Sequence, residues 1–118
     1  MKLDLSVEDR PFAPGEWIRG RVEVVEGGRS RRLTVMLHHR DSTTDYTGTI
    51  QTIETAALHS GDLTAPASLE FAVQVPPDAL PTYSGALGST FWELDAKSDE
   101  PGMDTHARKR IVVALPAR

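Results

Sequence analysis

Apolar and polar side chains alternate along much of this chain, and one such stretch lies in its last third. Trp92, Leu94 and Ala96 are each followed by a charged residue. A period of two places these three side chains on one face of a β-strand and the charged ones on the other. Such a strand must cover its apolar face with a second layer. Because the neighbouring segments also have the features of strands, we expect that layer to be another sheet.

The remaining strands are expected in six further segments. These are Lys2–Glu8, Glu16–Glu26, Leu33–Arg40, Asp41–Gly61, Leu69–Val75 and Ala107–Leu115. Gly20, inside the second of them, indicates a bulge or a close backbone neighbour. The segment Asp41–Gly61 is ambiguous, because its threonines favour a strand while Ile50, Ile53 and Ala57 fall at helical spacing. We predict a strand there, with a short helix as the alternative.

Prolines separate these segments. All eight lie between expected strands or at their ends, as Pro76-Pro77 and Pro116 do, which suits a residue that cannot donate to a β-ladder. Seven short strands with regular turns are typical of an immunoglobulin-like β-sandwich of two antiparallel sheets. At this length we expect residues 1–118 to form a single all-β domain.

The charge balance and the absence of cysteine narrow the classes of protein to consider. The 118 residues include 13 basic and 17 acidic side chains, with a net charge of −4, which argues against a nucleic-acid surface. Without cysteine there is no disulfide scaffold, zinc–thiolate site or thiol nucleophile. Acidic residues interrupt the N-terminus where a signal peptide needs an apolar core, and no window suits a membrane span. We expect a cytoplasmic protein with no transmembrane segment and no nucleic-acid partner.

Two segments carry a family resemblance. The first is Pro14-Gly15-Glu16 followed by the alternating Ile18, Gly20 and Val22. The second runs from Val75-Pro76-Pro77 through Gly85 to Trp92, Leu94 and Ala96, and then to Asp99 and Pro101-Gly102-Met103-Asp104. In this order they resemble arrestin-like N-terminal domains, nearest to small bacterial relatives of the Spo0M sporulation-control type.

This resemblance implies a sandwich of seven or more strands and an adaptor role without catalysis. Full arrestins carry two sandwiches in tandem, with a polar core between them, whereas we expect only one here. Receptor-type switching is therefore not implied. A lone sandwich must protect or use its open edge strands, which are available for edge-to-edge dimerisation.

Four histidines are candidate metal ligands: His38, His39, His59 and His106. Adjacent residues of a strand point to opposite faces, so His38 and His39 cannot bind one ion without a bulge. We expect one surface histidine and one partly buried, hydrogen-bonded histidine, and no metal site.

Acidic residues gather around a Pro-Gly turn: Asp95, Asp99, Glu100 and Asp104. They lack the spacing of a calcium loop, and Glu100-Pro101-Gly102-Met103 instead fits a type II turn. Two basic patches, at residues 29–32 and 108–110, are expected to be solvated loops. Ser84 lacks the motif of a nucleophile elbow, so we assign no catalytic residue.

Trp17 is the main residue that we expect in an exposed contact surface. The alternation that buries Ile18 turns Trp17 outward, and outward tryptophans often mark contacts, although a covering loop is the alternative. Phe91 faces outward by the same argument and would extend the patch. We predict the partner-binding residues Trp17, Arg19, Arg21 and Phe91, and no cofactor.

Three functions are compatible with these residues. The first hypothesis is a non-enzymatic arrestin-like interaction module that binds an unknown protein, or its own copy through edge strands. The alternative is a small-molecule or metal-binding sandwich that uses the histidines and the acidic turn, which would require them to share one concave pocket. The third is a structural subunit of a larger assembly.

Overall fold

The computed structural model describes residues 1–86 and 88–115, and in this part the chain forms nine β-strands. They are β1 (Lys2–Val7), β2 (Trp17–Glu26), β3 (Gly28–Ser42), β4 (Thr47–Glu54), β5 (His59–Leu63), β6 (Ala67–Gln74), β7 (Tyr83–Gly85), β8 (Gly88–Asp99) and β9 (Thr105–Ile111). None of the described segments forms a helix that could cross a membrane.

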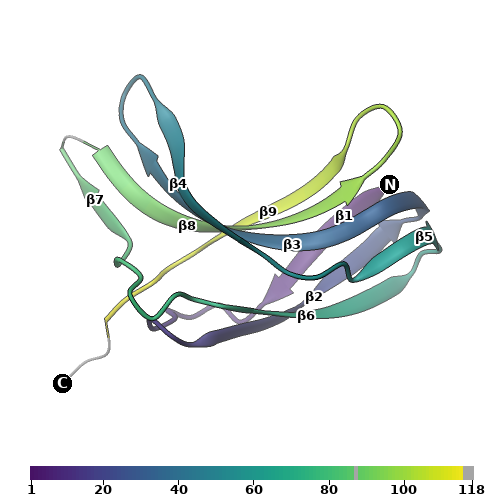
Figure 1. The fold of residues 1–118 in the computed structure, drawn as a ribbon, viewed down its shortest axis with the longest axis horizontal. Helices are drawn as coiled ribbons and strands as arrows, with labels where there is room; N and C mark the ends of the chain where they lie inside the picture. Colours follow the sequence, from purple (N-terminus) through teal and green to yellow (C-terminus); the bar gives the residue numbers. More distant parts are fainter. Residues whose placement is uncertain (87, 116–118) are drawn as a thin grey trace.

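The strands form two antiparallel sheets that face each other (Figure 1). The smaller sheet has the order β1-β2-β6. The larger follows β4-β3-β8-β7, with β5 also paired to β3 and β9 to β8. The expected all-β sandwich is confirmed, but the described residues form nine strands where about seven were expected.

The alternating apolar rows meet between the two sheets. In the β3–β8 pair, Leu37 lies opposite Leu94 and His39 opposite Trp92. The inward rows of β1, β2 and β6 pack against them and close the core, which stabilises the fold mainly by removing apolar surface from water. The core includes Leu3, Leu5, Ile18, Val22, Leu33, Val35, Leu37, Phe71, Val73, Trp92, Leu94 and Ala96.

Trp92 is the largest fully buried side chain of the described core. The ring of His39 stacks on its indole, with the ring centroids 4.4 Å apart and the planes 3° apart. The indole N–H donates to the carbonyl oxygen of Leu80 at 2.9 Å. This bond satisfies the polar end of a side chain that is otherwise apolar, and it fixes the segment before β7 to the centre of the larger sheet.

Residues 41–61 contain the end of β3, all of β4 and the start of β5, so the prediction of strand is confirmed and the helical alternative is wrong. β4 pairs with the second half of β3, and β5 with the first half. Ile50 is 56% exposed while Ile53 is partly buried. The helical spacing of these residues therefore does not mark a common buried face.

Gly20 has close neighbours rather than a bulge. A Cβ at this position would lie 2.6 Å from the Ser6 carbonyl oxygen and 2.9 Å from the Phe71 ring, while the register of β2 with both its neighbours is continuous there. The last strand is shorter than expected, because β9 ends at Ile111 and Val113 makes only an isolated bridge to Phe12. Pro116 lies outside the described residues.

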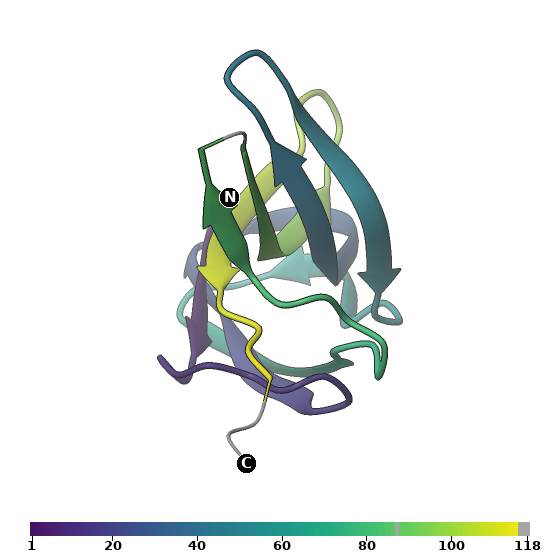
Figure 2. The same ribbon diagram turned by 90° about the vertical axis from the view of Figure 1, so that its left-hand side faces the viewer.

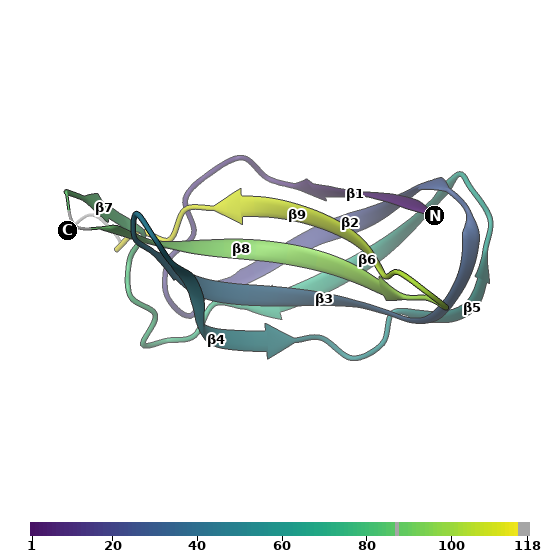
Figure 3. The ribbon, with the colours of Figure 1, turned by 90° about the horizontal axis from the view of Figure 1, so that it is seen from above.

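The two long sides of the sandwich differ. On one side β1 lies beside β9, as seen from above in Figure 3, so the two sheets close on each other. On the other side β4 and β5 are the outermost strands of the larger sheet and β6 is that of the smaller one. Figure 2 shows the two layers from the end of the sandwich. The candidate site lies on this second side.

Candidate interaction groove

The strand β6 is an edge strand, since β2 is the only strand that pairs with it in the described part of the chain. At its end, the N–H of Val75 donates to the Glu16 carbonyl at 2.9 Å. Because successive residues of a strand direct their backbone groups to opposite sides, the odd-numbered residues of β6 bond to β2. The even-numbered residues direct theirs at the open side: Ser68, Glu70, Ala72 and Gln74.

Two adjoining cavities follow this edge. A cavity of about 640 Å³ is lined by residues 19–21 of β2, residues 70–72 of β6 and residues 55–58 of the β4–β5 connection. A second cavity, of about 430 Å³, is lined by Trp17, residues 53–55, residues 72–74 and Pro76. They share Thr55 and Ala72, and together we call them the edge groove. Its size is in the range that binding sites occupy.

The structure brings three of the four predicted partner-binding residues together at this groove. Trp17, Arg19 and Arg21 occupy alternate positions of β2 and line the two cavities. Trp17 is 49% exposed, and both arginines are exposed. The expected outward direction of Trp17 is therefore confirmed, and no loop covers it completely.

The two arginines differ in their charge partners. Arg21 lies opposite Glu70 in the β2–β6 register, and their side chains are 3.5 Å apart. Arg19 lies opposite Ala72, and no carboxylate of the described residues is within ion-pair distance of it. The groove therefore carries one guanidinium group, beside a small residue, that is available to a ligand's carboxylate.

Phe91 does not extend the patch of Trp17, which corrects the expectation. It belongs to β8 in the larger sheet, whereas Trp17 belongs to the smaller one. Phe91 is only 6% exposed, because the guanidinium group of Arg110 lies 3.9 Å from its ring centroid. This cation–π contact covers a side chain that points away from the core.

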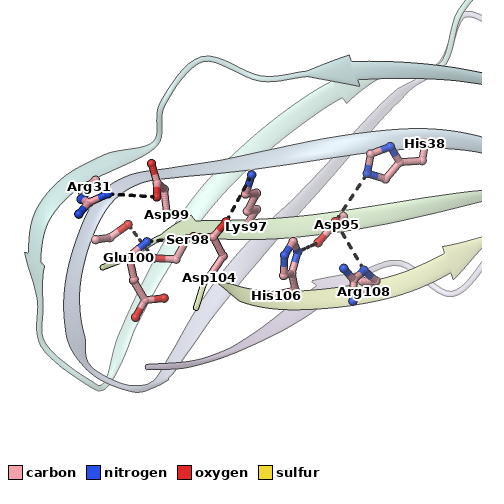
Figure 4. A network of polar contacts seen from close by, with 11 residues as sticks. Arg31, His38, Asp95, Lys97, Ser98, Asp99, Glu100, Asp104, His106 and Arg108 are labelled. Carbon is pink, nitrogen blue, oxygen red and sulfur yellow. Dashed lines mark hydrogen bonds and ion pairs between the residues drawn. The ribbon is translucent and has the colours of Figure 1, made fainter. Parts of the chain in front are cut away.

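A polar cluster lies on the outer face of the larger sheet, centred on Asp95 (Figure 4). Asp95 is 2% exposed. His106 Nδ1 lies 2.9 Å from its Oδ1, and His38 Nε2 and Arg108 Nε both lie 3.6 Å from its Oδ2. The side chains come from β3, β8 and β9, so the cluster joins three strands. The fixed positive charge of Arg108 and the hydrogen bond with His106 offset the cost of burying this carboxylate.

The expected surface histidine is buried as well. His38 is 8% exposed and His39 3%, although they do point to opposite faces as expected. His38 Nδ1 lies 2.8 Å from the Thr52 hydroxyl. Burial, with a smaller contribution from Arg40, lowers the pKa of His38 despite the opposing effect of Asp95. Burial also lowers the pKa of His39.

The histidines and acids do not share a concave pocket. His38 and His106 meet at Asp95, but His39 lies in the core and His59 bonds to the Asp62 carbonyl. Residues 1–86 and 88–115 contain no group of three or more His, Asp or Glu arranged to hold a metal ion. Among the described residues, no histidine lines the edge groove or the cavity between residues 8–11 and 109–112.

The acidic turn is used in the chain's own structure. Gly102 has a φ of +91°, as a type II turn requires at its third position. The N–H of Glu100 donates to Asp104 Oδ1 at 3.2 Å, and this bond lowers the pKa of Asp104. Lys97 lies 3.6 Å from the other oxygen of that carboxylate.

Comparison with known proteins shows where this architecture recurs. No family model and no curated protein matches the sequence. The structure is similar to Spo0M, a sporulation control protein from Bacillus subtilis, with a TM-score of 0.67 and 21% sequence identity. The alignment covers 98% of this chain. The chain has the arrestin-like fold.

The arrestin-like sandwich spans about half of the Spo0M chain that it matches, at 49% of its length. At 21% identity the similarity concerns the fold, and it assigns no function to any individual residue. The role of the edge groove therefore has to be inferred from the residues of this chain.

Sequence reasoning found the β2 wall of the groove but not the opposite one. Residues 55–58 carry no motif, and their place beside β6 depends on the path of the chain between β4 and β5. The available signal was Glu70, an acidic residue on the expected strand Leu69–Val75, which lies opposite Arg21 in the β2–β6 register.

Proposed function

We propose that this chain is a non-enzymatic, cytoplasmic protein-interaction module that binds another protein chain in the edge groove. In this proposal the single sandwich of residues 1–118 acts as an adaptor, and Trp17, Arg19 and Arg21 contact the partner. Phe91 is left out of the contact surface, because Arg110 covers it.

The observation that carries the proposal is the unpaired edge of β6 beside an exposed tryptophan. An exposed strand edge offers a row of backbone donors and acceptors, and extended segments of other proteins bind to such edges by strand addition. Tryptophan and arginine are also the residues that most often dominate binding energy at protein interfaces.

The arrestin-like fold supports the same function. One solved structure that it matches, Spo0M, is described as a sporulation control protein, and a sandwich that acts by binding fits a regulatory role. The histidines and acidic residues support a metal or small-molecule site less well than the groove supports an interaction module. Arg108 places a fixed positive charge at Asp95, where a cation would bind.

Site-specific photo-cross-linking in cells that express the protein tests this function. A photoreactive phenylalanine derivative in place of Trp17 should give a discrete covalent adduct with another protein chain. The adduct should become weaker when Arg19→Ala is added, because the arginine contacts the same partner.

Tyr46 supplies the matched control. It is 63% exposed and lies in the β3–β4 turn, outside the groove. The same photoreactive residue there should give no discrete adduct. Equal labelling from positions 17 and 46, or no adduct from position 17, would refute the proposed binding surface.

A further inference from the structure

We propose that the chain bound in the edge groove is a second copy of this one, with the two β6 strands paired antiparallel. This inference rests on the proposed function, because it names the partner of the same groove. The result would be one continuous sheet in the order β1-β2-β6-β6-β2-β1, related by a two-fold axis.

The composition of β6 makes it self-compatible as an edge. Glu70 is its only charged residue in the sequence Ala-Ser-Leu-Glu-Phe-Ala-Val-Gln. Edge strands that avoid pairing usually carry lysine, proline or a bulge, and β6 has none of these within its bounds. Its register with β2 is regular over all eight residues, so the free edge is straight enough to accept a second strand.

The position of Glu70 selects the register. A two-fold axis at position 70 would place the two Glu70 side chains opposite each other, which is unfavourable. An axis at position 72 would place Ser68 opposite Pro76, which has no N–H to donate. An axis at Phe71 avoids both, since it places Glu70 opposite Ala72 and Ser68 opposite Gln74 of the second copy.

This register also supplies the missing charge partner of Arg19. Arg19 lies opposite Ala72 within its own chain, and Ala72 would lie opposite Glu70 of the second copy. A guanidinium group on a long side chain can pass over the small alanine and reach that carboxylate. Each Glu70 would then lie between Arg21 of its own chain and Arg19 of the other, and the symmetry forms this arrangement twice.

The inward side chains agree with the same register. Leu69 is only partly buried, and it would lie opposite Val73 of the second copy. The two Phe71 residues would lie opposite each other at the axis, each with its ring packed over Gly20 of its own chain. Apolar residues therefore meet apolar residues on the inner face, while the outer face pairs opposite charges.

Two measurements test the dimer on the full chain. Sedimentation velocity should give a concentration-dependent dimer. The chain lacks cysteine, so Ala72→Cys introduces a single thiol. In the proposed register the two Cα atoms at position 72 lie about 8 Å apart, from the spacings of an antiparallel sheet, and a short bismaleimide should join them. Thr49→Cys, on the exposed part of β4, is the matched control and should not be cross-linked.

Charge reversal tests the register itself. Arg19→Glu should weaken dimerisation roughly tenfold, because it sets two pairs of like charges across the interface. Adding Glu70→Arg to that variant should restore dimerisation. A double variant no better than Arg19→Glu alone would overturn this register.

The possible failures distinguish this inference from the proposed function. If the chain sediments as a monomer while photo-cross-linking at position 17 captures a different protein, the inference is wrong and the proposed function stands. If the chain dimerises but Ala72→Cys is not joined and position 17 gives no adduct, the interface lies elsewhere and both are wrong.

Discussion

His39 combines a stacked ring with an unpaired polar atom inside the sandwich. Its ring packs on Trp92, and its Nε2 is buried without a hydrogen-bond partner among the described residues. Burial lowers the pKa of His39 below its ordinary value of 6.5. Between the pKa of His39 in the folded protein and 6.5, the unfolded chain binds more protons than the folded one. The contribution of neutral His39 to stability is therefore fully present above pH 6.5 and is lost as the pH falls through this window.

We expect His39→Phe to reduce the loss of stability between pH 7.5 and pH 5.5. Phenylalanine keeps the stacking on Trp92 and cannot be protonated. Urea denaturation at the two pH values measures the effect, and His38, whose pKa is also lowered, should leave part of the loss in place. An unchanged loss in the variant would show that His39 is not the group responsible.

Glycine is required at position 20 of β2, because the Ser6 carbonyl of β1 and the Phe71 ring of β6 both lie close to it. Because an added Cβ would lie 2.6 Å from the Ser6 carbonyl oxygen, we expect Gly20→Ala to destabilise the fold by about 1–3 kcal/mol. Gly28→Ala is the matched control, since its Cβ would meet nothing closer than Met1 at 3.4 Å. Equal urea midpoints for the two variants would contradict this account.

The sequence predicted which way a side chain points, but not whether side chains of neighbouring strands bury it. The alternation gave the correct outward direction of Trp17 and Phe91. Phe91 is nevertheless buried, because Arg110 comes from a strand that pairs with β8 at a register the sequence does not specify. For the same reason Asp95, which the alternation places on the charged face of its strand, is enclosed by side chains of two neighbouring strands.

At the scale of elements, the strands with strong alternation were predicted correctly. The number of strands was not, because the short strands show no clear alternation. The segments at β1, β2, β6 and β8 were predicted within a few residues. β7 has three residues and β5 has five, which is too short for a period of two to be distinctive. Residues 41–61 accordingly contain β4 and most of the β5 region, where one strand was expected.

The importance of β6 could not be derived from its own sequence. Its alternation predicted a strand, while its position at the open edge follows from which strands pair. Pairing between distant segments is set by the whole core, not by local preference. The groove therefore depends on long-range contacts, although three of its residues were already candidates.

For the molecule as a whole, the asymmetry of the sandwich is the central feature. One side is closed by β1 against β9, and the other presents β6 with the edge groove. The arrestin-like fold provides the sandwich, and the half-length match to Spo0M leaves the binding role to be tested on this chain.

Amide hydrogen exchange along β6, measured residue by residue at low and high protein concentration, tests this account most directly. The amides of Phe71 and Val73, bonded to β2, should be protected at both concentrations. Those of Glu70 and Ala72, directed at the open side, should exchange quickly in dilute solution and slowly when the edge is occupied. Slow exchange at Glu70 and Ala72 in dilute solution would contradict an open edge. Exchange there that is equally fast at every protein concentration and in lysate of expressing cells would contradict the binding of protein at this edge.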